Sequence, residues 1–279
     1  MGNLTTEQYR QIKEDVVVIA RRYNIARMLM PVRGPLGLGM RQYSYTQLTE
    51  LSDAIISHTF ETRDMDNPNI PQTNVNIPVL QKTFEIDALD IASAARAGQS
   101  LDTMAAGSAA YKVTYAENDL VINGFDKDGS TYDVEGLYEA ADNTQTGSSF
   151  GTAGYALASV TAAMGDLMDD SIMAPYNLVL HPDQYAELKG SVMSNGDREF
   201  THIKDILGGG DIYTTAFIAA GTGMVLSTPQ ARLFELVIGQ DMTVETVDIK
   251  KDKVVFGRVY ETCAPVIYDT NAICTLTSI

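Results

Sequence analysis

Residues 239–244 read Gly-Gln-Asp-Met-Thr-Val and directly follow an apolar run at 234–238 that has the composition of a β-strand. The combination of this hexapeptide with a preceding strand is uncommon. Further β-type segments flank it, at 224–226, 254–259 and 272–276. The C-terminal part of the chain is therefore predicted to consist mainly of strands, and the last segment to return to a sheet.

An amphipathic helix is predicted near the start of the chain. Thr5-Thr6-Glu7-Gln8 fits a capping box, with Thr5 as the N-cap residue. Apolar residues then recur at steps of three and four: Tyr9, Ile12, Val16, Ile19 and Tyr23. This stripe predicts a helix to about residue 26, because a proline-containing stretch at 31–35 ends it.

A long two-stranded arm is predicted between residues 42 and 84. Segments 57–62 and 75–79 look extended, and they flank a tip at 64–74 that is rich in Pro, Asn and Asp. An isolated hairpin of this length is marginally stable in water. The arm is therefore expected to find its partners on another molecule.

Two longer helices are predicted in the middle of the chain. Asp102 can cap a helix that runs to about residue 122, where Asn123-Gly124 closes it. After a polar passage at 126–154, a second helix carries apolar residues on one side: Leu157, Val160, Met164, Leu167 and Met168. An α+β lobe then follows, with a strand at 178–180, a helix from Pro182 and a strand at 212–213.

The composition is that of a folded globular protein: 279 residues, 45% of them hydrophobic and 20% charged. The formal net charge is −16, so most of the surface would repel a nucleic acid. We find no signal peptide and no apolar run that could span a bilayer. We therefore expect a cytoplasmic protein without nucleic-acid or membrane partners. Its two cysteines, Cys263 and Cys274, are expected to be reduced thiols in apolar surroundings.

Several motifs could indicate catalysis or ligand binding, but the residues around them do not support these functions. The glycines of 34–39 are not preceded by a strand and lack the lysine of a phosphate-binding loop. Glu199 and His202 have the Glu-x-x-His spacing of a di-iron site, but the chain has no second copy. The three histidines lie in separate segments, far from either cysteine. We therefore expect no catalytic residue, no metal ligand and no cofactor, and a protein that is not an enzyme.

With these elements in place, segment 239–244 resembles the Gly-Gln-Asp-Leu-Ser signature of encapsulins, the linocin-like shell proteins of nanocompartments. Further blocks agree in order: Leu4-Thr5, Ala26-Arg27, Gly34-Pro35-Leu36-Gly37, Ile77-Pro78-Val79-Leu80, Gly136-Leu137 and Ala174-Pro175-Tyr176-Asn177-Leu178-Val179. Two features depart from the family pattern. Residues between Gly124 and Gly136 form an insertion, and the chain has no tryptophan, so a flavin stacked on a shell tryptophan is not expected.

The resemblance implies the α+β fold of tailed-phage major capsid proteins, with a P-domain, an extended arm (E-loop) and an A-domain. The corresponding boundaries are 1–48 for the N-terminal helix and first part of the P-domain, 49–83 for the E-loop, 84–135 for the P-domain with its long central helix, 136–228 for the A-domain and 229–279 for the C-terminal strands of the P-domain.

The function implied by the resemblance is self-assembly into a closed icosahedral shell of about sixty subunits or a multiple. The shell would enclose a cargo enzyme, a ferritin-like protein or a dye-decolourising peroxidase, held by a C-terminal targeting peptide, for iron storage or protection against oxidative stress. The alternative is the major capsid protein of a tailed virus or prophage, which encloses a genome instead.

Two sites follow from the same resemblance. A groove for the cargo peptide would be lined by Val17, Ala20, Asn24, Ile25, Asp241 and Met242. Core packing would explain the apolar residues of this set equally well. A loop at the five-fold pore would contain Ser194, Asn195, Gly196 and Asp197, whose small polar and charged side chains suit an aqueous opening.

Overall fold

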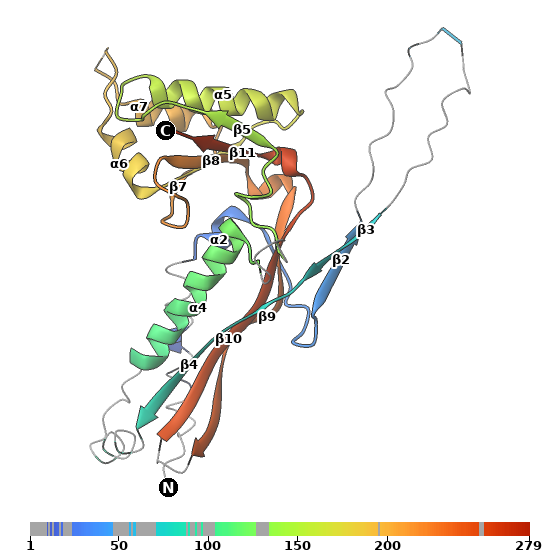
Figure 1. The fold of residues 1–279 in the computed structure, drawn as a ribbon, viewed down its shortest axis with the longest axis vertical. Coiled ribbons are helices and arrows are strands. Elements are labelled where there is room, and N and C mark those ends of the chain that lie inside the picture. Colours follow the sequence, from blue (N-terminus) through green and yellow to red (C-terminus); the bar gives the residue numbers. More distant parts are fainter. Residues whose placement is uncertain are drawn as a thin grey trace.

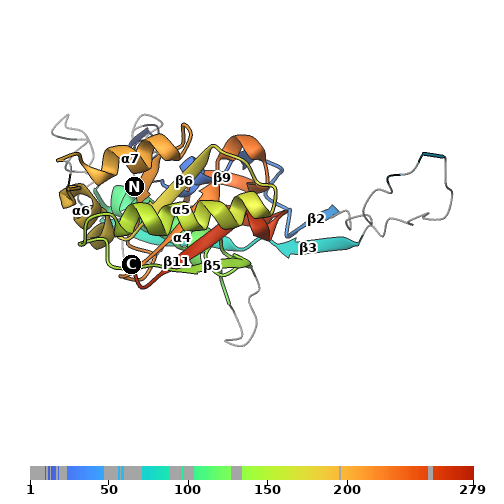
Figure 2. The ribbon, with the colours of Figure 1, turned by 90° about the horizontal axis from the view of Figure 1, so that it is seen from above.

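The fold of the chain is given by a computed structural model (Figure 1). The described residues are 10, 12, 14–16, 18, 24–46, 56, 58–59, 71–87, 89, 93, 96, 104–126, 134–194, 196–250 and 254–279. They form two sheets, with helices packed on both, and a two-stranded arm that projects from the body (Figures 1 and 2). No helix in these ranges is long and apolar enough to cross a membrane.

The first sheet is built on a long antiparallel ribbon of β9 (Phe234–Lys250) and β10 (Val254–Ile267). β4 (Val79–Asp87) pairs antiparallel with β10, and the short β1 (Val32–Arg33) pairs parallel with β9. Every second residue of a strand points to the same face. The resulting apolar face of the sheet carries Phe84 and Ile86 of β4, Val244 of β9 and Val259 of β10.

The helix α4 (Met104–Asn123) packs on this apolar face. Its contact side is made of small residues, which let the helix lie close to the strands: Ala106, Ala109, Ala110 and Val113. Gly124 follows the helix with a φ of +76°, a conformation that glycine adopts without strain. The sequence prediction of a helix closed at Asn123-Gly124 is thereby confirmed.

The chain then returns to the end of α4. Leu137 donates its backbone N–H to the carbonyl of Val121, and Tyr138 donates to that of Ile122, both at 2.9 Å. These are carbonyls of the last helical turn, which have no partner within the helix. Gly136 makes the approach possible, because a Cβ on it would lie 2.2 Å from the backbone nitrogen of Gly124.

The second sheet has the strand order β5–β11–β8–β6–β7. Its strands are β5 (Asn143–Thr146), β6 (Tyr176–Leu180), β7 (Ile212–Thr214), β8 (Thr222–Ser227) and β11 (Ile273–Thr277). The helices of this lobe are α5 (Tyr155–Asp169), α6 (Pro182–Gly190) and α7 (Glu199–Ile206). On α5, Val160 and Leu167 are buried as predicted, whereas Met168 is exposed.

The arm pairs β2 (Gln42–Thr46) with β3 (Gln72–Asn76) in antiparallel register. It extends away from the two sheets on the side opposite α6 and α7 (Figures 1 and 2). Within the described chain, neither strand of the arm has a second strand neighbour. Of the strand predicted at 57–62, His58 and Thr59 are described and are not in a strand; the other residues lie outside the described ranges.

Two short helical turns and one short helix complete the described elements: α2 (Ala26–Leu29), η1 (Pro229–Ala231) and η2 (Thr270–Ala272). The described residues 10, 12, 14–16 and 18 are helical, but residues 24 and 25 are not. The sequence predicted one continuous helix to about residue 26. Residues 24 and 25 instead lead into a separate helix, α2, at whose start the side-chain oxygen of Asn24 accepts the N–H of Arg27 at 3.0 Å.

The largest cluster of buried residues joins the two sheets. From the first sheet it contains Leu236, Val237, Ala264 and Val266; from the second it contains Val179, Met224, Leu226 and Ile273. Leu29 and Met30 beside α2 and Leu120 to Ile122 of α4 belong to the same cluster. One continuous core therefore supports both sheets, and a second cluster fills the space under α5 and α7.

Candidate functional site

The candidate groove residues lie at the junction of α2, α4 and the β9–β10 ribbon. Asn24 is buried and Ile25 is half-buried, immediately before α2. Asp241 is exposed and Met242 half-buried, on β9. The structure brings these two pairs together through Arg27, which donates from Nη2 to Asp241 Oδ1 at 2.9 Å. Val17 and Ala20 lie outside the described residues.

Asp241 and Met242 sit in a bulge of the continuous strand β9. On β10, Thr262 pairs with Gln240, and Tyr260 pairs with Thr243. Two residues of β9 therefore stand opposite the single residue between them, which is the pattern of a β-bulge. Bulges redirect side chains, and here the Asp241 carboxylate is held over the end of α2, where it also accepts the N–H of Met242 at 2.9 Å.

The segment at 24–26 is fixed by an asparagine of α4. Asn118 Oδ1 accepts the backbone N–H of Ile25 at 3.0 Å and that of Ala26 at 2.9 Å. A side-chain oxygen that accepts two N–H groups at a helix start satisfies donors that the helix itself leaves unpaired. The position of Ile25 on the surface is therefore set by α4.

Beneath this surface lies a buried charged cluster. We use this term for Asn24, Arg27, Glu117 and Glu261; Arg27 also reaches the exposed Asp241 above it. Arg27 Nε donates to Glu117 Oε1 at 2.9 Å, and its Nη2 contacts Glu261 Oε1. Asn24 Nδ2 donates to Glu117 Oε2 at 2.6 Å. The side chains of Glu117 and Glu261 are fully buried, so this cluster is far less screened than a surface ion pair.

The electrostatics of this cluster favour the neutral form of one carboxyl group. Burial and, after it, the charge of Glu117 raise the pKa of Glu261 to about 8, against the opposing effect of Arg27. Burial likewise raises the pKa of Glu117, again against Arg27. Burial lowers the pKa of Arg27, but its attraction to the two carboxylates outweighs this, and the net pKa is raised. One guanidinium does not neutralise both carboxylates.

Cys263 adjoins the same cluster. Its sulfur and one oxygen each of Glu117 and Glu261 lie within 4.8 Å of one another. The expectation that Cys263 sits in apolar surroundings is therefore wrong on one side of its thiol. Burial raises the pKa of this thiol well above its ordinary value, and the two glutamates add to that. Both cysteines are buried and free, as the sequence predicts.

The sequence analysis missed this cluster, because its members are far apart in the chain. A local signal existed nevertheless. Glu117 follows Val113 by four positions on the buried side of α4, and Glu261 alternates with the buried Val259 and Cys263 on β10. A charged residue at a core position of either pattern requires a buried partner.

The candidate pore loop joins α6 to α7. Val192 and Arg198 form an isolated antiparallel bridge, and Met193 donates its N–H to the carbonyl of Asp197 at 2.8 Å. Ser194, Gly196 and Asp197 are exposed within the tight turn that results; Asn195 lies outside the described residues. This turn belongs to the end of the lobe that is farthest from the arm (Figure 1).

The Glu-x-x-His pair of α7 has a structural role. Glu199 is buried, and its carboxylate accepts the N–H groups of Gly154 at 3.2 Å and of Leu157 at 2.7 Å. It also accepts the hydroxyl of Ser191 at 2.6 Å. Glu199 therefore caps the start of α5, where unpaired N–H groups favour a negative charge.

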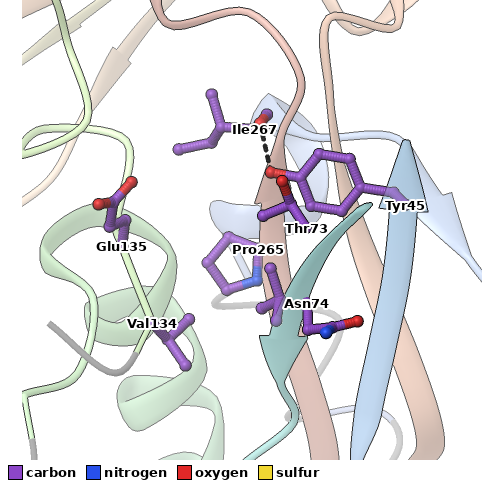
Figure 3. Close-up of a pocket in the computed structure, with 8 residues that line it drawn as sticks. Tyr45, Thr73, Asn74, Val134, Glu135, Pro265 and Ile267 are labelled. Carbon is purple, nitrogen blue, oxygen red and sulfur yellow. Dashed lines mark hydrogen bonds between the residues drawn. The ribbon is translucent and has the colours of Figure 1, made fainter. Parts of the chain in front are cut away.

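A cavity of about 190 Å³ lies where the arm leaves the body (Figure 3). Tyr45 and Thr73 of the arm face Pro265 and Ile267 of β10 across it, and Tyr45 donates its hydroxyl to the Ile267 carbonyl at 3.3 Å. Among the described residues, its lining contains one carboxylate, Glu135, and neither histidine nor cysteine. It lacks a nucleophile with an adjacent base, and its position marks it as the junction between arm and body.

The chain is similar to the proteins of a known family. The model of a family described as encapsulating protein for peroxidase matches residues 1–264. The type 1 encapsulin shell protein EncA of Myxococcus xanthus is 26% identical over 98% of this chain and 93% of its own length. A diheme-cytochrome-encapsulin shell fusion protein of Kuenenia stuttgartiensis is 25% identical, over 87% of this chain and 65% of its own length.

Solved structures share the fold. A virus-like particle from Pyrococcus furiosus has a TM-score of 0.72 at 20% identity and covers 97% of this chain and 100% of its own. The capsid of Myoviridae phage XM1 has a TM-score of 0.72 at 11% identity, over 91% of both chains. The expected α+β capsid-type fold is thus confirmed.

Proposed function

This chain belongs to the encapsulin family and is a shell protein of a capsid-like compartment; from this premise we propose that about sixty copies, or a multiple, close into an icosahedral shell around a cargo enzyme. The observation that carries the proposal is the family match over residues 1–264. The domain boundaries expected from the family, with the E-loop at 49–83 and the A-domain at 136–228, are part of the same proposal.

The arm supports assembly on physical grounds. β2 and β3 pair with each other, and neither has a second strand neighbour in the described chain. Such a ribbon offers unpaired N–H and C=O groups along both edges, which favours pairing with another chain. Two strands alone are marginally stable, so contacts with neighbouring subunits would stabilise the arm.

The first experiment is electron microscopy of the native protein, with mass spectrometry of whatever co-purifies. We expect closed, uniform shells that contain one enriched enzyme and no nucleic acid. Particles filled with nucleic acid would instead support the alternative of a viral or prophage capsid protein. A small soluble oligomer would contradict both.

We further propose a cargo-peptide groove at the surface formed by Asn24, Ile25, Asp241 and Met242. The structure supports it in two ways. The apolar side chains of Ile25 and Met242 lie half-exposed, and Met242 is next to the exposed Asp241; an extended peptide is recognised through such side chains. The bulge and Asn118 fix the backbone on both sides, so the surface is rigid before a peptide binds.

Replacing Met242 by aspartate is expected to reduce the cargo retained per shell about tenfold, because burying a methionine contributes about 1.5–3 kcal/mol. The measurement is the ratio of cargo to shell protein in purified particles. Met173→Asp is the matched control, since Met173 is an exposed methionine in the lobe of the second sheet. Equal cargo in both variants would contradict the proposed groove.

We propose that the loop at 194–197 lines the five-fold pore and admits small cations. The exposed Asp197 and the chain's net charge of −16, repeated over the shell, would concentrate cations around it. Deleting residues 195–197 is expected to change the rate at which Fe²⁺ reaches a ferritin-like cargo, measured as iron oxidation in loaded shells. An unchanged rate of iron oxidation would contradict the proposed role of this loop.

The remaining proposals concern the setting of the shell. The cargo is a ferritin-like protein or a dye-decolourising peroxidase, held by a C-terminal peptide, and the shell serves iron storage or protection against oxidative stress. We place it in the cytoplasm, because two buried, free cysteines suit a reducing compartment. Proteomic identification of the co-purified enzyme decides between the two cargoes.

A further inference from the structure

Three potential metal ligands meet inside the subunit. Glu117 comes from α4, and Glu261 and Cys263 come from β10. The two β10 residues are two positions apart, so both point to the face that α4 covers. One ligand atom from each residue lies within 4.8 Å of the other two, and all three residues are fully or nearly fully buried.

The second observation is an unpartnered polar atom inside this group. Among the described residues, Glu261 Oε2 is buried and has no hydrogen-bond partner. Arg27 holds Oε1 of Glu261 and Oε1 of Glu117, and Asn24 holds Glu117 Oε2. A buried carboxylate oxygen without a partner is costly, and one guanidinium faces two carboxyl groups and a thiol. The group therefore has a free ligand atom and, when its protons are displaced, the negative charge to receive a cation.

The donor set selects the class of cation. Calcium and magnesium take oxygen ligands, whereas a thiolate favours softer ions. Zinc accepts mixed sets of cysteine and carboxylate, at about 2.3 Å from sulfur and about 2.0–2.2 Å from oxygen. Arg27 and Asn24 would act from outside, since hydrogen bonds to ligating carboxylates fix their orientation.

We propose that Glu117, Glu261 and Cys263 form a structural Zn²⁺ site that ties α4 to β10, with a water molecule in the fourth position. The ion neutralises the excess charge and coordinates the oxygen that lacks a partner. Because the site is closed to solvent, the ion enters as the subunit folds, and folding and binding are coupled. The site lies within a single subunit, so its test does not depend on the cargo, the pore or the size of the shell.

The test is elemental analysis of shells produced without cargo in zinc-supplemented medium. We expect about one zinc ion per chain, and its loss to background in Cys263→Ala, because removing even an outer partner of a metal ligand typically costs about 10–100-fold in affinity. Cys274→Ala is the matched control: Cys274 is the other buried free cysteine, and it lies in the second sheet on β11. This variant should keep its zinc.

Growth in cobalt gives a second readout that does not depend on the variant's stability. Co²⁺ bound by a thiolate produces a sulfur-to-metal charge-transfer absorption band. We expect this band in the wild type and in Cys274→Ala, and not in Cys263→Ala. Wild-type shells without zinc and without the band would overturn the proposal, and a proton would then neutralise the cluster. If the protein binds zinc but does not form shells, the zinc site is supported and the proposed assembly is contradicted instead.

Discussion

Replacing Arg27 by methionine is expected to lower the free energy of unfolding by about 3–5 kcal/mol, the cost of removing one partner from a buried ion pair. Arg27 is the guanidinium that faces both Glu117 and Glu261 within the buried cluster. Without it, two fully buried carboxyl groups lose their countercharge. The measurement is chemical denaturation at fixed chain concentration, since assembly makes stability depend on concentration.

A matched control for Arg27→Met is Arg258→Met. Arg258 pairs with Glu245 at 2.6 Å, but both side chains are substantially exposed, at 40% and 50%. Exposed pairs contribute about 0–1 kcal/mol, so this variant should stay close to the wild type. If both substitutions lower the free energy of unfolding by the same amount, the two buried carboxyl groups do not depend on Arg27 for their charge balance.

Substituting Gly136 by alanine is expected to lower the free energy of unfolding by about 3 kcal/mol, the upper end of what overpacking usually costs. A Cβ at this position would lie 2.2 Å from Gly124 N and 2.5 Å from both Asn123 C and Ile122 O. All three are backbone atoms, which cannot rotate away as a side chain can. The hydrogen bonds by which residues 137 and 138 close the end of α4 would lengthen with the shift.

Gly165→Ala is the control for Gly136→Ala, because it makes the same substitution at a glycine with open space around it. Gly165 lies inside α5, and a Cβ there would meet nothing within 4 Å. Alanine is favoured over glycine within a helix by about 0.5–1 kcal/mol, so this variant should be slightly more stable than the wild type. A loss of stability in Gly165→Ala, or none in Gly136→Ala, would contradict the packing described above. Both are read by the same denaturation experiment.

Much of the fold could be predicted from local patterns. The end of α4 follows from Asn123-Gly124, the start of α6 follows from Pro182, and β6 and β8 follow from short apolar runs. The break between the N-terminal helix and α2 could not be predicted in this way. It depends on Asn118, which holds residues 25 and 26 from a helix more than ninety positions later.

The candidate site was predicted in part, for a physical reason. The resemblance selected Asn24, Ile25, Asp241 and Met242, and the structure places the two pairs on either side of Arg27. Periodicity and spacing describe neighbours along one helix or strand, and they do not report which carboxylates meet across elements. Glu117 and Glu261 meet only through the packing of α4 on β10, so their pairing with Arg27 was not visible in the sequence.

The core that the two sheets share affects how a subunit unfolds. Leu236 and Val266 of the first sheet and Met224 and Ile273 of the second belong to the same buried cluster. Unfolding either sheet would expose apolar surface of the other, so we expect the two sheets to unfold together. In the proposed shell, we therefore expect damage to be confined to whole subunits. A subunit with only one sheet unfolded, which would leave an apolar and permeable patch in the shell, is not expected to be populated.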